Sequence, residues 1–314
     1  MTIYFMGGEM PSFIPSDSSA TEVTTVGTFD AAFGRCGLRP GGTGTFYVET
    51  PQLTLPDTLY THIYFRRDQA TSLTKNLISY YAGATEVFRV EISDTTLQMK
   101  ALISAVMTNV GSTVGIAVDT PESIDIYFQG NDATGDVKLF MAGTERASAT
   151  VDLTSVTGIT HARCYHGAFV SQVIIADEPT IGWRLLTRYP NGAGTSSAWT
   201  GTYTDVDEIV YDDADFCNSS TNGQVEQFTQ TGPAITGYTV RAVGVYARAK
   251  RGASGPTNLQ IGLRSSGTDY FSASKALSVG YSAYGEIWET NPATSAAWLN
   301  TAIDALQPSI KAVT

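Results

Sequence analysis

Apolar and polar residues alternate in short segments along nearly the whole chain, and Gly, Asn, Asp, Ser and Thr separate these segments. Alternation with a period of two predicts half-buried β-strands, and frequent turn residues between them are typical of antiparallel sandwiches. The clearest expected strands are residues 59–65, 87–92, 123–128, 137–141, 172–175, 238–247 and 259–264. Between Phe128 and Val137, the turn-rich sequence Gln-Gly-Asn-Asp-Ala-Thr-Gly-Asp predicts a hairpin.

One helix is expected, close to the C-terminus. Asn291 is a residue type that caps helices, Pro292 suits the first helical position, and Pro308 would end the helix. The apolar residues at helical spacing between them are Leu299, Ala302, Ile303 and Leu306. The pattern predicts a helix over residues 292–306, the longest of the chain, with one face packed on a sheet.

Composition and charge both change near residue 180. All four tryptophans lie beyond that point, at positions 183, 199, 288 and 298. Residues 1–180 hold 19 acids and 10 bases, whereas residues 181–314 hold 11 acids and 9 bases. We therefore expect a boundary near Asp177–Thr180, with one sandwich over residues 25–180 and a second over residues 181–314.

Residues 1–24 differ from both predicted domains. Gly7, Gly8, Pro11 and Pro15 interrupt apolar residues that have no regular period. These apolar residues are Ile3, Tyr4, Phe5, Met6, Phe13 and Ile14. Such an arm must bury its apolar side chains against something, either its own sandwich or a neighbouring subunit. We expect docking on a neighbour, and hence a homo-oligomer.

The overall composition excludes several classes of protein. With 42% apolar and 16% charged residues, the chain of 314 residues is expected to fold, and its net charge of −11 argues against nucleic-acid binding. The most apolar uncharged stretch, residues 102–118, contains too many small polar residues for a membrane span. No Lys or Arg precedes Arg35, so the N-terminus does not have the pattern of a secretory signal, and synthesis in the cytoplasm is expected.

The cysteines and histidines offer one combination that suits zinc by residue type. Cys36, Cys164 and Cys217 are too far apart to form a disulfide framework. His161, Cys164 and His166 are close in sequence, but positions 161 and 164 of a strand point to opposite faces and no fourth ligand follows. We therefore expect structural roles and no metal or cofactor.

Enzyme motifs are missing from the sequence. The closest approach to a nucleophile elbow is Gly252-Ala-Ser-Gly255, which has the wrong spacing. Glu122 and Asp125 would lie on opposite faces of a strand, so they do not form the carboxylate pair of a glycosidase. No catalytic residue is expected.

Two acidic loops leave calcium binding open, although solvated turns are the better interpretation. One loop contains Asp205, Asp207, Glu208, Asp212, Asp213 and Asp215, and the other contains Asn131, Asp132 and Asp136.

Several sequence segments resemble a family of tailed-phage and gene-transfer-agent virion proteins with a concanavalin A-like, or laminin G-like, sandwich. The segments in the first half are residues 1–10, 60–67, 123–128, 135–140 and 171–178, and those in the second half are residues 184–194, Trp199, 206–208 and 287–294. They cover most of the chain but are not catalytic motifs.

The resemblance implies an all-β fold of two tandem jelly-roll sandwiches, the first concanavalin A-like, with one short C-terminal helix. It also implies a non-enzymatic virion protein on the particle exterior, as a head spike or fibre, a capsid decoration or a tail component. Its expected partners are other capsid or tail proteins, and host-surface polysaccharide is a second expected partner. For such glycan contact the candidates are exposed tyrosines, because aromatic faces stack on sugars, although each more commonly serves a core or strand pair. These tyrosines are Tyr80, Tyr81, Tyr165, Tyr203 and Tyr211. The alternative is a glycan-degrading or glycan-binding tail protein of the lectin/glucanase superfamily, and fold alone does not decide between them.

Overall fold

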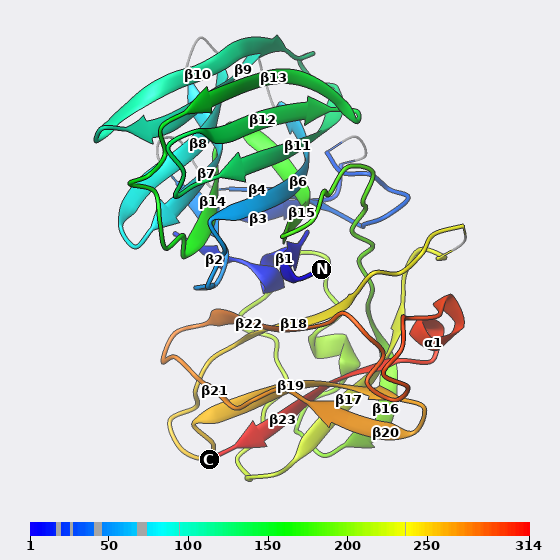
Figure 1. Ribbon diagram of the computed structural model, residues 1–314. Coiled ribbons are helices and arrows are strands. Elements are labelled where there is room, and N and C mark those ends of the chain that lie inside the picture. Colours follow the sequence, from blue (N-terminus) through cyan, green and yellow to red (C-terminus); the bar gives the residue numbers. More distant parts are fainter. Residues whose placement is uncertain (17–19, 26–27, 41–45, 68–73, 94, 236) are drawn as a thin grey trace. The chain divides into compact units, whose positions relative to one another are not determined.

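The computed structural model describes residues 1–314 except 17–19, 26–27, 41–45, 68–73, 94 and 236. The described chain is nearly all β and divides into two compact units (Figure 1). The first unit comprises Met1–Glu9 and Phe13–Leu185, and the second comprises Met10–Ser12 and Leu186–Thr314. The division after Leu185 lies close to the change in charge and in tryptophan content, although Trp183 belongs to the first unit.

The first unit forms two antiparallel sheets from the described residues. The larger sheet has the order β13 (Thr144–Val151), β12 (Gly135–Met141), β11 (Pro121–Gln129), β6 (Thr58–Arg67), β15 (Ala168–Ala176), β4 (Gly37–Arg39) and β3 (Thr21–Val23), and β1 (Ile3–Gly7) also pairs with β15. The smaller sheet has the order β10 (Val106–Gly115), β9 (Thr96–Ile103), β8 (Thr85–Ser93), β7 (Lys75–Ala82), β14 (His161–Tyr165), β5 (Tyr47–Glu49) and β2 (Ile14–Pro15).

The inward faces of these two sheets pack against each other through aromatic rings. Phe128 of the larger sheet lies 5.7 Å from Tyr80 and 5.0 Å from Phe88 of the smaller sheet, measured between ring centroids. All three side chains are fully buried. The alternation along β11 explains this, since Ile124, Ile126 and Phe128 all point inward. The first unit is therefore a β-sandwich.

The second unit is a smaller sandwich. One sheet has the order β16 (Tyr189–Ser197), β17 (Val225–Thr231), β23 (Gln307–Val313), β19 (Asn258–Ser265) and β20 (Thr268–Phe271), with β21 (Lys275–Ala276) also paired to β19. The other consists of β18 (Val243–Ala249) and β22 (Ser282–Trp288). Their shared core contains Val245, Leu259, Ile261, Leu263, Trp298, Ile303 and Leu306. Short 3-10 helices η1 (Met10–Ser12) and η2 (Tyr203–Asp205) also belong to this unit.

The expected strands and the hairpin are confirmed, but the start of one strand is corrected. Phe128 pairs with Val137, which makes β11 and β12 the predicted hairpin. The strand expected over residues 238–247 begins at Val243. The segment 102–118 lies mostly in the hairpin β9–β10, and no helix among the described residues is long and apolar enough to cross a membrane.

The predicted helix over residues 292–306 is wrong in extent, because α1 spans only Asn300–Asp304. Asn291 does not cap it: its side-chain oxygen accepts hydrogen bonds from Ala293 N and Ser265 Oγ, in a turn that brings Asn291 beside Ala296. Ser295 has a φ of +54°, which a continuous right-handed helix does not allow. Sequence reasoning mistook a turn with a buried Asn for a helix start.

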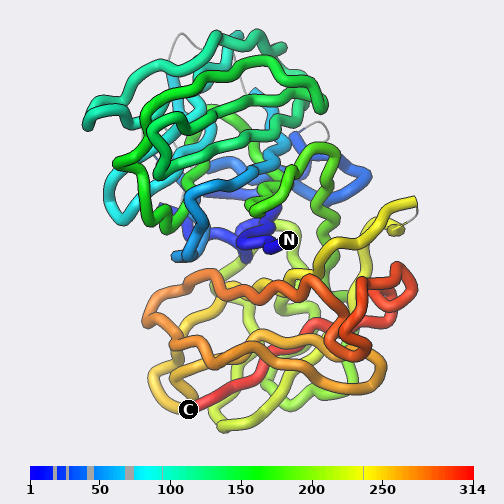
Figure 2. The backbone as a smooth tube through the Cα atoms, in the orientation of Figure 1, coloured from blue at the N-terminus to red at the C-terminus, as the bar shows by residue number. Residues whose placement is uncertain are grey.

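The N-terminal arm is a second correction. β1 runs antiparallel to β15, with Phe5 opposite Ile175 and Met6 opposite Ile174, and it lies within the first unit (Figure 2). Ile3, Phe5, Met6, Met10 and Phe13 are all buried by the chain itself. The arm therefore follows the alternative in which it packs within its own chain, and the apolar surface that argued for a docked neighbour is already covered.

Candidate functional site

The outward face of the smaller sheet of the first unit carries a cluster of tyrosines around an arginine. The residues of this tyrosine–arginine cluster are Tyr47 and Glu49 of β5, Tyr81 of β7, and His161, Arg163 and Tyr165 of β14. Strand register places them on one face, because Glu49 pairs with Arg163, Tyr47 with Tyr165, and His161 with Tyr81. Residues directly opposite in neighbouring strands share a face.

Arg163 is the centre of the cluster. Its guanidinium carbon lies 4.2 Å from the ring centroid of Tyr47 and 4.1 Å from that of Tyr81. Its Nε donates to Glu49 Oε2 at 2.9 Å. Burial disfavours the charged guanidinium, but the hydrogen bond and charge of Glu49 outweigh burial and raise the pKa of Arg163. The arginine is a fixed cation between two aromatic faces.

The rings themselves are locked by further contacts. Tyr81 stacks on His161 with centroids 5.1 Å apart and an interplanar angle of 9°, and its hydroxyl shares a short hydrogen bond with that of Tyr165. Burial, followed by the neighbouring Tyr81, raises the pKa of Tyr165. Burial lowers the pKa of His161, with Glu49 opposing and Arg163 adding to the effect. The rings are therefore held in place by their neighbours.

A row of charged side chains continues the same face across the sheet. Arg163 is opposite Ser79, Ser79 is opposite Arg89, and Arg89 is opposite Lys100. Arg89 bonds Glu86 at 2.8 Å and Glu91 at 2.6 Å, and Lys100 bonds Glu91 at 2.9 Å. With Glu49 and Arg163 the face holds three acids and three bases, each in an ion pair. The cations remain partly exposed, 22% for Arg163 and Lys100, whereas Glu91 is buried.

Such a face suits binding better than acid–base catalysis. Tyrosine rings stack on the apolar faces of sugars, and paired guanidinium and carboxylate groups donate to and accept from hydroxyls. Glu49, Glu86 and Glu91 are each held by a cation. The oxygens of these carboxylates are engaged in the ion pairs, so the face presents hydrogen-bonding groups that are already oriented.

The candidate tyrosines named from the sequence fall into different places. Tyr81 and Tyr165 come together in the cluster. Tyr80 points into the core, fully buried, and donates to Thr61 Oγ1 at 2.8 Å. Tyr203 and Tyr211 lie in the second unit, where the Tyr211 ring contacts Arg248 at 4.8 Å. Sequence reasoning missed Tyr47, although its alternation with Glu49 across a buried Val48 was a usable signal.

His161 and Cys164 do not share a face. His161 stacks on Tyr81, on the outward side, whereas Cys164 is fully buried and pairs across the sheet with Ile78 in the core. Burial raises the pKa of the Cys164 thiol to about 12. Opposite faces of one strand do not converge on one ion.

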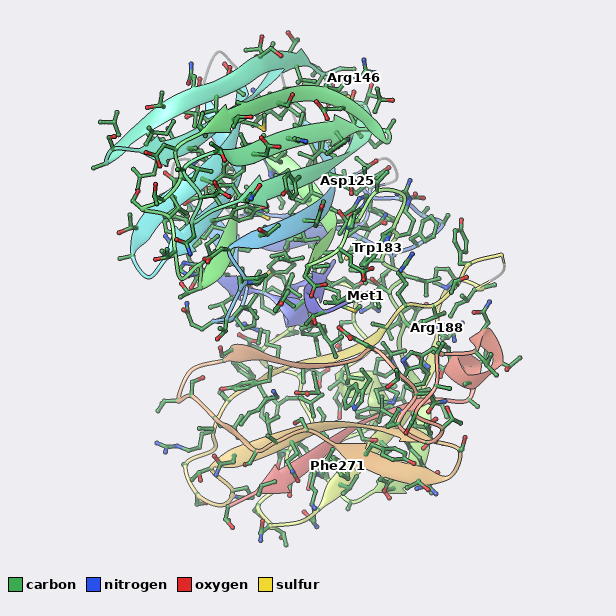
Figure 3. The ribbon with its side chains drawn as sticks, in the orientation of Figure 1. Met1, Asp125, Arg146, Trp183, Arg188 and Phe271 are labelled. Atoms are coloured by element: carbon green, nitrogen blue, oxygen red, sulfur yellow. The ribbon has the colours of Figure 1, made fainter. Side chains whose placement is uncertain are left out.

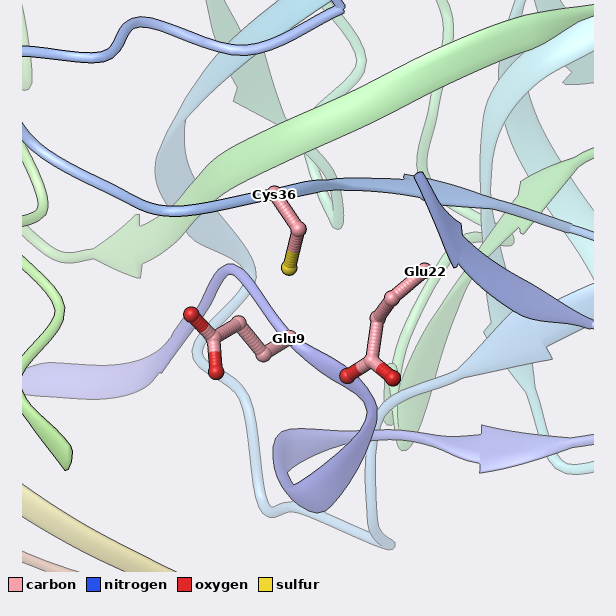
Figure 4. A group of neighbouring side chains, drawn as sticks. All are labelled: Glu9, Glu22 and Cys36. Atoms are coloured by element: carbon pink, nitrogen blue, oxygen red, sulfur yellow. The ribbon is translucent and has the colours of Figure 1, made fainter. Parts of the chain in front are cut away.

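Within the described residues, one group of potential metal ligands has all its donor atoms within 4.8 Å of one another: Glu9, Glu22 and Cys36 (Figure 4). All three are buried. Arg35 donates to both oxygens of Glu9, from Nε at 3.2 Å and from Nη2 at 3.1 Å. Burial, then the charges of the two glutamates, raises the pKa of the Cys36 thiol. A guanidinium on one ligand and a protonated thiol both oppose a dication, so the group fits a charge-compensated structural cluster better.

The two acidic loops are occupied with local hydrogen bonds. Asp205 accepts from Thr202 N at 2.8 Å, Asp212 accepts from Ala214 N at 2.8 Å, and Asp213 pairs with Arg248 at 2.8 Å through both oxygens. In the other loop Asp132 accepts from Thr134 N at 2.7 Å, and Asp136 accepts from Thr150 Oγ1 at 2.7 Å. The bonds of Asp132, Asp205 and Asp212 are those of ordinary turns, whereas Asp136 bonds across the pair β12–β13 and Asp213 forms a long-range ion pair.

No family model matches the chain, and no curated protein matches it either. Solved structures similar to it include the cellulose-induced protein Cip1, with 13% identity over 54% of this chain and 93% of that one, at a TM-score of 0.40. A carbohydrate esterase from the Shiga toxin-encoding bacteriophage phi24B has 10% identity over 55% of this chain and 98% of that one, at a TM-score of 0.39. The binding domain of botulinum neurotoxin DC, in complex with rat synaptotagmin II, has 9% identity over 81% of this chain and 67% of that one, at a TM-score of 0.39. At such TM-scores these similarities carry no argument about the function of this chain.

Proposed function

We propose that the chain is a non-enzymatic structural protein of a phage particle, displayed on the particle exterior, and that its first sandwich contacts host-surface glycans through the tyrosine–arginine cluster. The virion role rests on the sequence resemblance described above. The glycan role rests on one observation: Arg163 lies between the rings of Tyr47 and Tyr81 on an outward sheet face and is hydrogen-bonded to Glu49. Tyr81 and His161 are buried, so the stacking surface that this arrangement offers consists of the partly exposed Tyr47 and Tyr165 rings, beside groups that pair with sugar hydroxyls.

The charge balance of the face supports a binding role over the alternative of glycan degradation. Each of its three acids is paired with a base. Neutral, hydroxyl-rich ligands fit a balanced face better than polyanions, because a polyanion needs unpaired cations.

The glycan role is tested by binding of the intact chain to an array of host capsular and lipopolysaccharide glycans. Arg163→Ala removes the central cation and should reduce binding at least tenfold, because the glycan loses a guanidinium donor and the rings and Glu49 lose the group that positions them. Arg146→Ala is the matched control, because Arg146 is an exposed arginine of the same unit on β13 (Figure 3). Absence of binding by the unaltered chain, or equal binding by both variants, contradicts the role of this face.

The virion role is tested separately. Antibodies against the intact chain should label the outside of purified particles in electron micrographs. Particles that lack the protein, or that carry it only inside the capsid, contradict this part of the proposal. Turnover of any array glycan by the purified chain would favour the degrading alternative instead.

A further inference from the structure

A buried polar group lies on the outward face of the larger sheet of the first unit. His62 of β6 is directly opposite Asp125 of β11, and both side chains are buried although their neighbours Ile63 and Ile124 take the inward positions. The segment 177–185, here called the strap, follows β15 and contributes Thr180 to this group. Asp125 and the strap residue Trp183 are labelled in Figure 3.

Asp125 is the acceptor of two hydrogen bonds. His62 Nδ1 lies 3.0 Å from Asp125 Oδ1, and Thr180 Oγ1 donates to the same oxygen at 2.8 Å. A carboxylate accepts, so the proton of a neutral His62 imidazole is on Nδ1. Nε2 of His62 then presents a lone pair, and this atom is buried without a hydrogen-bond partner among the described residues.

Two donors without partners lie on the neighbouring strand β15. Ser171 is opposite Tyr64, which is on the same face of β6 as His62, and Ile174 is opposite His62. Between them the register shifts, and Gln172 has a φ of +51°, as expected where a β-bulge adds a residue. Ser171 Oγ and Gln172 Nε2 are buried and have no partner among the described residues, while Gln172 Oε1 accepts from Leu185 N of the strap at 3.2 Å.

We propose that one ordered water molecule lies beneath the strap and joins these three groups. It accepts hydrogen bonds from Ser171 Oγ and Gln172 Nε2 and donates one to His62 Nε2. An acceptor and two donors on one face form the set that a buried water satisfies, and leaving all three unpaired is unfavourable. With His62 fully buried, and Ser171 and Gln172 at 5% and 4% exposure, the group is closed to larger ligands.

The assigned water connects the two points at which the strap is attached to the sheet. Thr180 anchors it directly to Asp125, and Gln172 anchors its end at Leu185. Through His62 and Gln172 the water links these two points. The last residues of the first unit are thus held to the sheet by buried polar contacts, where hydrogen bonds are strong.

Asp125, His62 and Ser171 are the three residue types of the catalytic triad of acyl-transfer enzymes. His62 Nε2 has no hydrogen bond to Ser171 or to any other described residue, and the strap covers the group. We therefore assign water and make serine reactivity an outcome of the test.

The test counts long-lived waters in the intact chain by ¹⁷O magnetic relaxation dispersion. Ser171→Val fills the space of the hydroxyl with a methyl group and removes a donor, so the count should fall by about one. Ser148→Val, at an exposed serine of β13 in the same sheet, should leave it unchanged. An unchanged count in a folded Ser171→Val chain overturns the assignment.

A crystal structure of the unaltered chain is the second measurement and does not depend on a variant folding. It should show a water within about 3.2 Å of both His62 Nε2 and Ser171 Oγ. Direct contact between these two atoms without a water overturns the proposal. Labelling of Ser171 by a fluorophosphonate probe also overturns it, because a reactive serine needs an accessible space and a direct bond to the histidine.

Discussion

Replacing Arg163 by Ala is expected to destabilise the first unit measurably even in the absence of a ligand. The change removes a hydrogen bond of 2.9 Å to Glu49 and the ring contacts at 4.2 and 4.1 Å to Tyr47 and Tyr81. A hydrogen bond to a charged group contributes about 1.5 to 3 kcal/mol, and partial exposure places this one at the lower end. Two cation–π contacts at partly exposed sites add about 0.5 to 1 kcal/mol each.

The expected loss is therefore about 2 to 4 kcal/mol in the free energy of unfolding of the first unit. For a unit of this size, each kcal/mol lowers Tm by about 2 to 4 °C, so Tm should fall by about 4 to 16 °C. Arg163→Lys keeps the charge but loses the planar group, so its Tm should lie between those of the unaltered chain and Arg163→Ala.

Differential scanning calorimetry of the intact chain is the suitable assay, because two units give two transitions that a single spectroscopic signal would merge. Only the transition of the first unit should move, and Arg146→Ala should leave both transitions in place. A shift below about 1 °C for Arg163→Ala would refute the reasoning, since the arginine would then be an ordinary exposed surface charge.

Three further outcomes are expected. Burial lowers the folded-state pKa of His161. The stabilising contribution of His161 is therefore present above its unfolded pKa of about 6.5 and is lost as pH falls through the lower folded value. Between pH 7 and 5, the calorimetric Tm of the first unit should fall less in His161→Phe than in the unaltered chain. Tyr80→Phe leaves Thr61 Oγ1 buried without its donor and should cost about 1 to 3 kcal/mol, whereas adding Thr61→Val should recover part of that loss in urea denaturation. Phe5→Ala should destabilise the first unit by about 3 to 5 kcal/mol by calorimetry, because Phe5 is 1% exposed; an effect below 1 kcal/mol would show that the arm packs elsewhere.

The strands were predictable because a sheet with one buried face imposes a period of two on the sequence. In β11 the inward residues Ile124, Ile126 and Phe128 alternate with Asp125 and Tyr127, and the alternation is visible without a structure. The hairpin to β12 was equally local, since its turn residues identify it.

The helix and the arm were not predictable for a different reason. Asn291 and Pro292 are residue types that start helices. In the structure Asn291 instead accepts a hydrogen bond from the hydroxyl of Ser265, on a distant strand, and lies in a turn. Local signals cannot reveal a partner 26 residues away. The arm pairs with β15, whose residues lie more than 160 positions after it in the chain. The arm has no regular period from which this pairing could be predicted.

The candidate site shows the same limit at the level of function. Tyr81 and Tyr165 are 84 residues apart, and nothing in the sequence indicates that they meet or that Arg163 bonds Glu49 beside them. Register decides this, because three strands from separate parts of the chain must pair for Tyr47, Tyr81 and Tyr165 to meet.

Covering the apolar arm within its own chain changes what must hold the protein on a particle. The side chains of Ile3, Phe5 and Met6 no longer offer apolar area to a neighbour, because β15 and its surroundings already take them up. If the chain assembles, its contacts must come from surfaces that remain exposed after folding. Removal of residues 1–10 would therefore expose one edge of β15 and unfold the first unit before it revealed anything about assembly. Substitutions at exposed positions are the variants that can separate folding from attachment.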